Sequence, residues 1–168
     1  MGYKEDALDF LGITKWHKAG YTGKGIKIMS DEKVYEKEHP DVISPKGVKS
    51  KKDHGDDVML HIKLVAPDAE FIAFPLSVNS DKKGGYISPC ADYIKNNGVH
   101  IFTTSCSAGN ILKHKEMAMQ DCIDKGCIFF GACGNDDKKG VRGEIKSEKY
   151  LAIGGVKPKF LGEYDENG

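Results

Sequence analysis

Short apolar runs alternate along the chain with longer segments whose apolar residues recur at helical spacing. This alternation predicts an α/β fold with a mainly parallel sheet, in which crossover helices connect the strands. Five apolar runs are the predicted strands: 26–29, 70–76, 99–104, 127–132 and 150–156. Three segments between them have helical character: 57–66, 88–96 and 111–125.

Polar residues follow several of the predicted strands. Glu32 follows the first strand, Ser105 the third and Asn135 the fourth. Because open parallel sheets place their sites at the carboxyl edge, we expect these three residues near one crevice. Any doubly wound fold gathers polar loops at that edge, so the pattern alone leaves both a functional site and an ordinary loop edge open.

The composition narrows the class of protein. The 168 residues fit one domain, and 39% hydrophobic and 30% charged residues are typical of a globular protein. The 25 basic and 25 acidic residues cancel, so no nucleic-acid partner is expected. No apolar run approaches the roughly 20 residues of a membrane span, and no signal peptide is evident. Five cysteines without paired spacing suit a reducing compartment, so we expect a cytoplasmic protein without a cofactor.

Five short motifs accompany this pattern. They are Gly-Tyr-Thr-Gly-Lys-Gly at 20–25, His-Pro-Asp-Val at 39–42, His-Gly-Asp-Asp-Val at 54–58, Val-Ala-Pro-Asp-Ala at 65–69 and Gly-Ala-Cys-Gly-Asn at 131–135. In this order they resemble motifs of the subtilisin-like serine proteases, the subtilases. The resemblance implies a three-layer αβα fold and covers roughly the first two thirds of such a catalytic domain. We expect a single, partial domain over 1–168, with an N-terminal helix and lead-in (1–25), a doubly wound core (26–156) and a tail (157–168).

The resemblance also implies where catalytic residues would lie. Counting back from His39 places Glu32 at the position of the catalytic aspartate. Asp57 falls at the histidine position, and His54 falls at the other histidine of the motif, to which this alignment does not assign the base. An aspartate, with an ordinary pKa of about 4, would not efficiently deprotonate a serine at neutral pH. Asn135 falls at the oxyanion position, where its amide would stabilise developing negative charge.

Two further groups of residues are expected near the crevice. The resemblance implies substrate-binding roles for Ser105, Cys106, Ser107, Ala132, Cys133 and Gly134. No histidine follows the two thiols at a place that would activate them, so structural roles are favoured over nucleophilic ones. Carboxylates could instead hold a hard cation, although acidic residues also occur at solvated helix N-termini. The candidate ligands are Asp31, Glu32, Asp56 and Asp57.

The nucleophile separates the functional hypotheses. Subtilases carry it in a Gly-Thr-Ser-Met-Ala segment, and no such segment occurs in these 168 residues. One hypothesis is therefore a catalytically inactive subtilase-fold protein that acts by binding a peptide or protein, or as a fragment of a longer protein. The alternative is a serine endopeptidase whose nucleophile lies on a C-terminal segment outside this sequence. Without that segment, strands 128–130 and 151–153 would lack cover on one face, so a homodimer or a protein partner is also expected.

Overall fold

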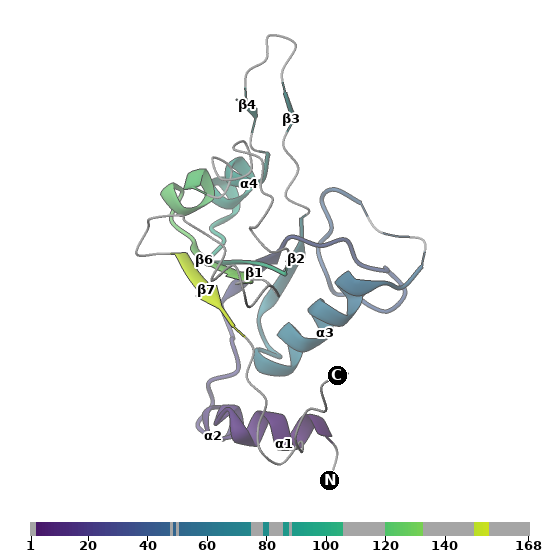
Figure 1. The fold of residues 1–168 in the computed structure, drawn as a ribbon, viewed down its shortest axis with the longest axis vertical. Coiled ribbons are helices and arrows are strands. Elements are labelled where there is room, and N and C mark those ends of the chain that lie inside the picture. The colour runs from purple at the N-terminus through teal and green to yellow at the C-terminus, as the bar shows by residue number, and fades with distance from the viewer. Residues whose placement is uncertain are drawn as a thin grey trace, which may run out of the picture.

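A five-stranded parallel sheet forms the centre of the molecule in the computed structural model (Figure 1). The structure describes residues 3–47, 49, 51–74, 79–80, 86–87, 89–105, 120–132 and 150–154. The strands of the sheet are Lys27–Ser30 (β1), Glu70–Ala73 (β2), Ile101–Thr104 (β5), Ile128–Ala132 (β6) and Tyr150–Ile153 (β7). Every pairing between them is parallel. The five strands predicted from the apolar runs are confirmed.

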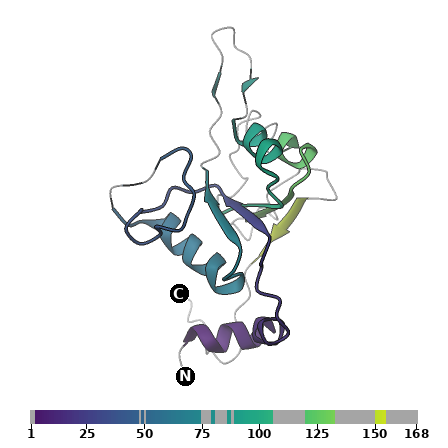
Figure 2. The same cartoon turned by 180° about the vertical axis from the view of Figure 1, so that it is seen from behind.

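Helices lie on both faces of the sheet, as the three-layer prediction requires (Figures 1 and 2). The helices are Tyr3–Phe10 (α1), Ile13–Lys18 (α2), His54–Val65 (α3) and Pro89–Asn97 (α4). Residues 120–124 are also helical, whereas the earlier part of the helix predicted over 111–125 lies outside the described residues. A small antiparallel pair, Asn79–Ser80 (β3) and Tyr86–Ile87 (β4), lies at the opposite end of the molecule from α1 and α2 (Figure 1). No helix in the described part of the chain is long and apolar enough to cross a membrane.

The strand order is β2-β1-β5-β6-β7, so the chain builds outward from β1 in one direction and then from β5 in the other. The topological switch point therefore lies between β1 and β5, where open α/β sheets bind their ligands. Contacts after the two strands hold this edge together. The Asp31 amide donates to the Thr103 carbonyl at 3.0 Å, and the Thr104 hydroxyl donates to the Asp31 carboxylate at 3.1 Å.

Two separate apolar clusters form because alternate residues of each strand point to opposite faces. One cluster packs the sheet against α4 and the helical residues 120–124, and it includes Met29, Ile72, Phe102 and Phe129. The other packs α3 against β1 and β2. The register continues this second face onto β6 and β7, where Ile128, Leu151 and Ile153 remain exposed. The part of the α3 face that β6 and β7 form is thus left partly uncovered by the described residues.

The first cluster should carry much of the stability. Phe102 is fully buried, and the centroid of its ring lies 4.7 Å from the centroid of the Phe129 ring. Phe102→Ala should lower the free energy of unfolding by about 3–5 kcal/mol, because it removes apolar contact and leaves a cavity. Ile128→Ala, at an exposed position of the neighbouring strand, should cost about 1 kcal/mol or less. Urea unfolding measures both, and equal losses would contradict this assignment of the core.

Candidate functional site

Glu32 lies just beyond the end of β1, at the switch point of the sheet. The neighbouring Asp31 is bound to β5 through its amide and its carboxylate. Glu32 points the other way, toward the start of α3, and only 11% of its side chain is exposed. The two adjacent carboxylates therefore point to different sides of the chain.

Helix α3 begins at His54, three residues earlier than the sequence pattern predicted. Asp53 is its N-cap and accepts a hydrogen bond from the Gly55 amide at 3.2 Å. The Asp56 carboxylate accepts one from the Asp53 amide at 2.8 Å, which completes a capping box. Lys49 contacts Asp53, and this ammonium together with the Gly55 amide lowers the pKa of the Asp53 carboxyl, so the cap stays ionised. These contacts place His54 in the first turn of the helix.

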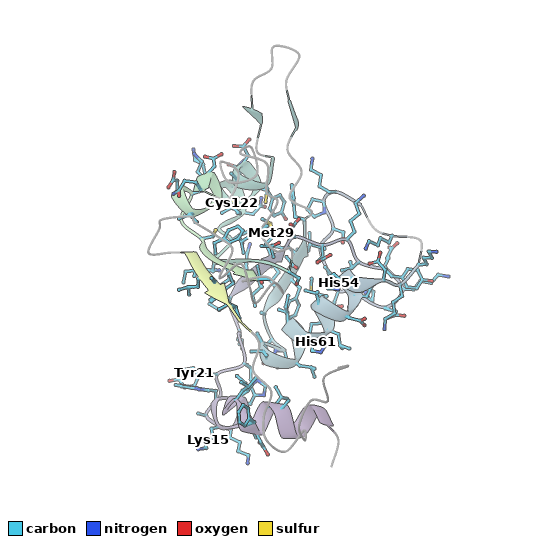
Figure 3. All side chains as sticks on the ribbon, in the orientation of Figure 1. Lys15, Tyr21, Met29, His54, His61 and Cys122 are labelled. Atoms are coloured by element: carbon cyan, nitrogen blue, oxygen red, sulfur yellow. The ribbon has the colours of Figure 1, made fainter. Side chains whose placement is uncertain are left out.

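The imidazole of His54 faces Glu32. Its Nε2 lies 3.7 Å from Oε1 of Glu32, about 0.7 Å longer than a normal N–H···O hydrogen bond. The His54 side chain is 69% exposed, so the imidazole is open to solvent while the carboxylate beside it is nearly covered. Figure 3 shows His54 near the beginning of α3 and His61 farther along the same helix. The site therefore places a carboxylate beside an imidazole, two groups that general-base catalysis uses when a hydrogen bond joins them.

Asp57, which the resemblance places at the histidine position, has other neighbours. The Asp57 side chain is 59% exposed and contacts Lys52 at 3.4 Å. Lys52 also lies 3.4 Å from Glu38, so Asp57 belongs to a surface group of charges. His54 is the only residue of 54–58 that carries an imidazole, and it is His54 that lies beside Glu32.

Burial sets the electrostatics of Glu32. Loss of hydration raises the pKa of its carboxyl, and the His54 imidazole is the largest opposing influence, because a positive charge favours the ionised form. The Glu32 Oε1 atom is buried and makes no hydrogen bond within the described part of the chain. A protonated His54 would therefore be the natural partner of the ionised Glu32, and each charge would stabilise the other.

The predicted substrate-binding residues are described only in part. Ser105 and Ala132 line a cavity of about 230 Å³ at the carboxyl ends of β5, β6 and β7. The other lining residues are Thr103, Thr104, Phe130, Gly131 and Ile153. Five predicted site residues lie outside the described residues: Cys106, Ser107, Cys133, Gly134 and Asn135.

The four carboxylates considered for a cation have separate partners. Asp31 binds β5, Glu32 faces His54, Asp56 accepts backbone amides, and Asp57 contacts Lys52. Over the ranges that the structure describes, no group of three or more histidine, cysteine, aspartate or glutamate side chains could hold a metal ion. The grouping of these carboxylates into one cation site is therefore not supported.

Comparison with known proteins bears on the fold. No protein-family model and no curated protein matches the sequence. The solved structure of the prenylagaramide maturation protease PagA matches with a TM-score of 0.65 and 19% identity, over 88% of this chain and 60% of PagA. The PatG macrocyclase in complex with peptide matches with a TM-score of 0.53 and 14% identity, over 89% of this chain and 64% of PatG. The structure of the patellamide maturation protease PatG matches with a TM-score of 0.53 and 13% identity, over 89% of this chain and 63% of PatG. The chain has a subtilisin-like fold, and it spans less than two thirds of each of these proteins.

Gly55 should tolerate no side chain. A Cβ atom there would lie 2.4 Å from the Lys33 carbonyl oxygen and 3.0 Å from Oε2 of Glu32. Gly55→Ala should therefore lower the free energy of unfolding by about 1–3 kcal/mol, despite the better helix propensity of alanine. Asp57→Ala, two residues farther along the same helix, should change it by about 0.5 kcal/mol or less because the side chain is exposed. Urea unfolding tests the pair, and an unchanged Gly55→Ala variant would show that the helix and the loop can separate freely.

The raised pKa of Glu32 should give a pH-dependent stability. The folded state holds the Glu32 proton more tightly than the unfolded chain, so this contribution is present below the ordinary pKa of 4.5 and is lost as pH rises through the higher folded pKa. Glu32→Gln cannot ionise. Its Tm relative to wild type should therefore become more favourable between about pH 4 and pH 7.

Thermal unfolding followed by circular dichroism across this range measures the trend. Glu36→Gln is the matched control, because Glu36 is an exposed glutamate of the same loop. A difference in Tm between Glu32→Gln and the wild type that does not change with pH, or that decreases as pH rises, would contradict the burial of the Glu32 carboxylate.

Proposed function

We propose that this chain contributes the acid–base half of a serine peptidase site, with His54 as the general base and Glu32 as the carboxylate that orients it. The observation that carries the proposal is the 3.7 Å contact between the Nε2 atom of His54 and the Oε1 atom of Glu32 at the switch point of the sheet. The subtilisin-like fold supports it. An aspartate at position 57 then no longer argues for inactivity, because the imidazole of the site is supplied by His54.

The chemistry follows from which ring nitrogen faces the carboxylate. If Nε2–H donates to Glu32, the Nδ1 atom of His54 carries the lone pair and takes the proton from a serine hydroxyl as that oxygen attacks a peptide carbonyl. The resulting imidazolium is stabilised by the ionised Glu32. It then returns the proton to the leaving amine, and water repeats the sequence on the acyl-enzyme. Asn135 is proposed to donate to the oxyanion, and Ser105 and Ala132 to border the bound substrate.

The nucleophile is proposed to come from a segment outside the 168 residues or from another chain. The printed sequence contains no Gly-Thr-Ser segment, and the chain covers 60% of PagA and 64% of PatG. The uncovered part of the α3 face and the cavity at the ends of β5, β6 and β7 offer a place for such a segment to pack. PagA and PatG are maturation proteases by name, which supports a peptide as the substrate class.

A catalytically inactive binding protein is the second candidate function. The exposed apolar residues Ile128, Leu151 and Ile153 favour it, because a contiguous apolar face commonly marks an interface. A second copy of the chain or a protein partner would then cover β6 and β7. In that case the His54–Glu32 pair would remain in place without a serine beside it.

Labelling with a fluorophosphonate separates these functions. The natural polypeptide that carries these residues, with any chain that copurifies, should be labelled at one serine outside the 168 residues. The 168-residue chain alone should not be labelled. His54→Ala should reduce the labelling rate of the natural polypeptide by at least about a thousandfold, because the base is removed.

His61→Ala is the matched control for this experiment. His61 lies on the same helix, but its Nδ1–H donates to the Asp57 carbonyl at 2.6 Å, so its loss should leave labelling unchanged. Labelling of a serine within the 168 residues, or labelling that survives His54→Ala, would contradict the proposal. Peptide binding without any labelling would identify the inactive binding protein.

A further inference from the structure

We propose that Asp56 is the positioning residue that holds Glu32 and His54 at their working distance, by joining the two chain segments that carry them. This inference rests on the proposed function, since it assigns a role to the His54–Glu32 pair. Asp56 is 1% exposed, although its neighbour Asp57 lies in solvent. A carboxylate buried to this extent needs partners that compensate for its lost hydration.

Two backbone amides are those partners, one from each segment. Oδ1 of Asp56 accepts from the Tyr35 amide at 2.5 Å, and Tyr35 is three residues beyond Glu32 in the same loop. Oδ2 accepts from the Asp53 amide at 2.8 Å, and Asp53 directly precedes His54. One carboxylate therefore bridges the loop that carries Glu32 and the helix start that carries His54.

A buried histidine supplies a third neighbour. Nδ1 of His39 lies 3.3 Å from the Lys63 ammonium, which can only donate, so this nitrogen is the acceptor. The proton of a neutral His39 is then on Nε2, which lies 3.6 Å from Oδ1 of Asp56. Lys63 also binds Asp41 at 2.5 Å. The far end of the loop is thereby attached to α3 as well, and Asp56 lies at the centre of these contacts.

The chemistry of the side chain explains why an aspartate fits here. Two backbone amides donate to the same side chain, and only a carboxylate of this length offers an acceptor oxygen to each of them. Asparagine has a single oxygen and would turn its NH₂ group toward one of the donors. Glutamate is the common residue at this position of a capping box and would keep the bond to Asp53, but its extra methylene would displace the bond to Tyr35.

The test measures the pKa of Glu32 by its side-chain ¹³C chemical shift in the folded 168-residue chain. The charged neighbours of Glu32 are His54, Asp31, Lys49 and Asp53. In the wild type, His54→Gln should raise the pKa of Glu32, because the imidazolium that lowers it is removed. Asp56→Asn should let water reach Glu32, so its pKa should fall toward 4.5, since burial is the main cause of its elevation. The response to His54→Gln should then shrink to about half or less.

Asp57→Asn is the control and should leave both measurements at their wild-type values. Asp56→Glu keeps the capping box and tests the same proposal if Asp56→Asn does not fold. A folded Asp56 variant in which the pKa of Glu32 and its response to His54→Gln are unchanged would reduce Asp56 to a helix cap and overturn the proposal. The measurement needs no peptidase activity. Failure of fluorophosphonate labelling and failure of the positioning role are therefore separate outcomes.

Discussion

The close approach of the first turn of α3 to the loop after β1 is the constraint on which the site depends. At Gly55 the two backbones lie so near that a Cβ atom would contact the Lys33 carbonyl oxygen and the Glu32 side chain. This approach buries Glu32 and places His54 beside it. It also brings two backbone amides within reach of the Asp56 carboxylate, which joins the loop to the helix. The geometry of the proposed acid–base pair is thus a product of local packing between two segments.

The carboxylates of Asp56 and Glu32 are both largely shielded from solvent, but they differ in their hydrogen bonds. Asp56 has a hydrogen bond on each oxygen, so its charge is compensated by oriented amide dipoles. The Oε1 atom of Glu32 makes no hydrogen bond with the described residues, and burial raises the pKa of the Glu32 carboxyl. Such a difference is typical where one carboxylate supports the structure and another takes part in proton chemistry. The contrast favours Glu32 as the functional group and Asp56 as its support.

The sequence predicted the sheet well, because apolar strands buried on both faces leave a clear signal. All five strands were predicted within a few residues, and Glu32 was correctly placed just beyond the end of β1. The contact between His54 and Glu32 was not predicted, because the start of α3 depends on hydrogen bonds that periodicity does not reveal. Asp53 and Asp56 cap the helix three residues before its apolar pattern begins, and this shift brings His54, rather than Asp57, to Glu32. The burial of Asp56 could not be predicted from the sequence either, because adjacent aspartates are usually exposed to solvent.

The sheet divides the proposed site along its switch point. On the β1 side, α3 and the loop after β1 form an apolar cluster with β1 and β2. His54 contacts Glu32 there, and His39 contacts Asp56. On the β5 side, no described residue covers the cavity at the strand ends or the exposed apolar residues of β6 and β7. Among the described residues, the hydrogen bonds and ion pairs of His54, Glu32 and Asp56 involve no residue of β6 or β7. The proposed acid–base pair can therefore assemble without the segment that would carry the nucleophile. In such a division, the packing of a further segment on the α3 face would bring a nucleophile to a base whose position is already fixed.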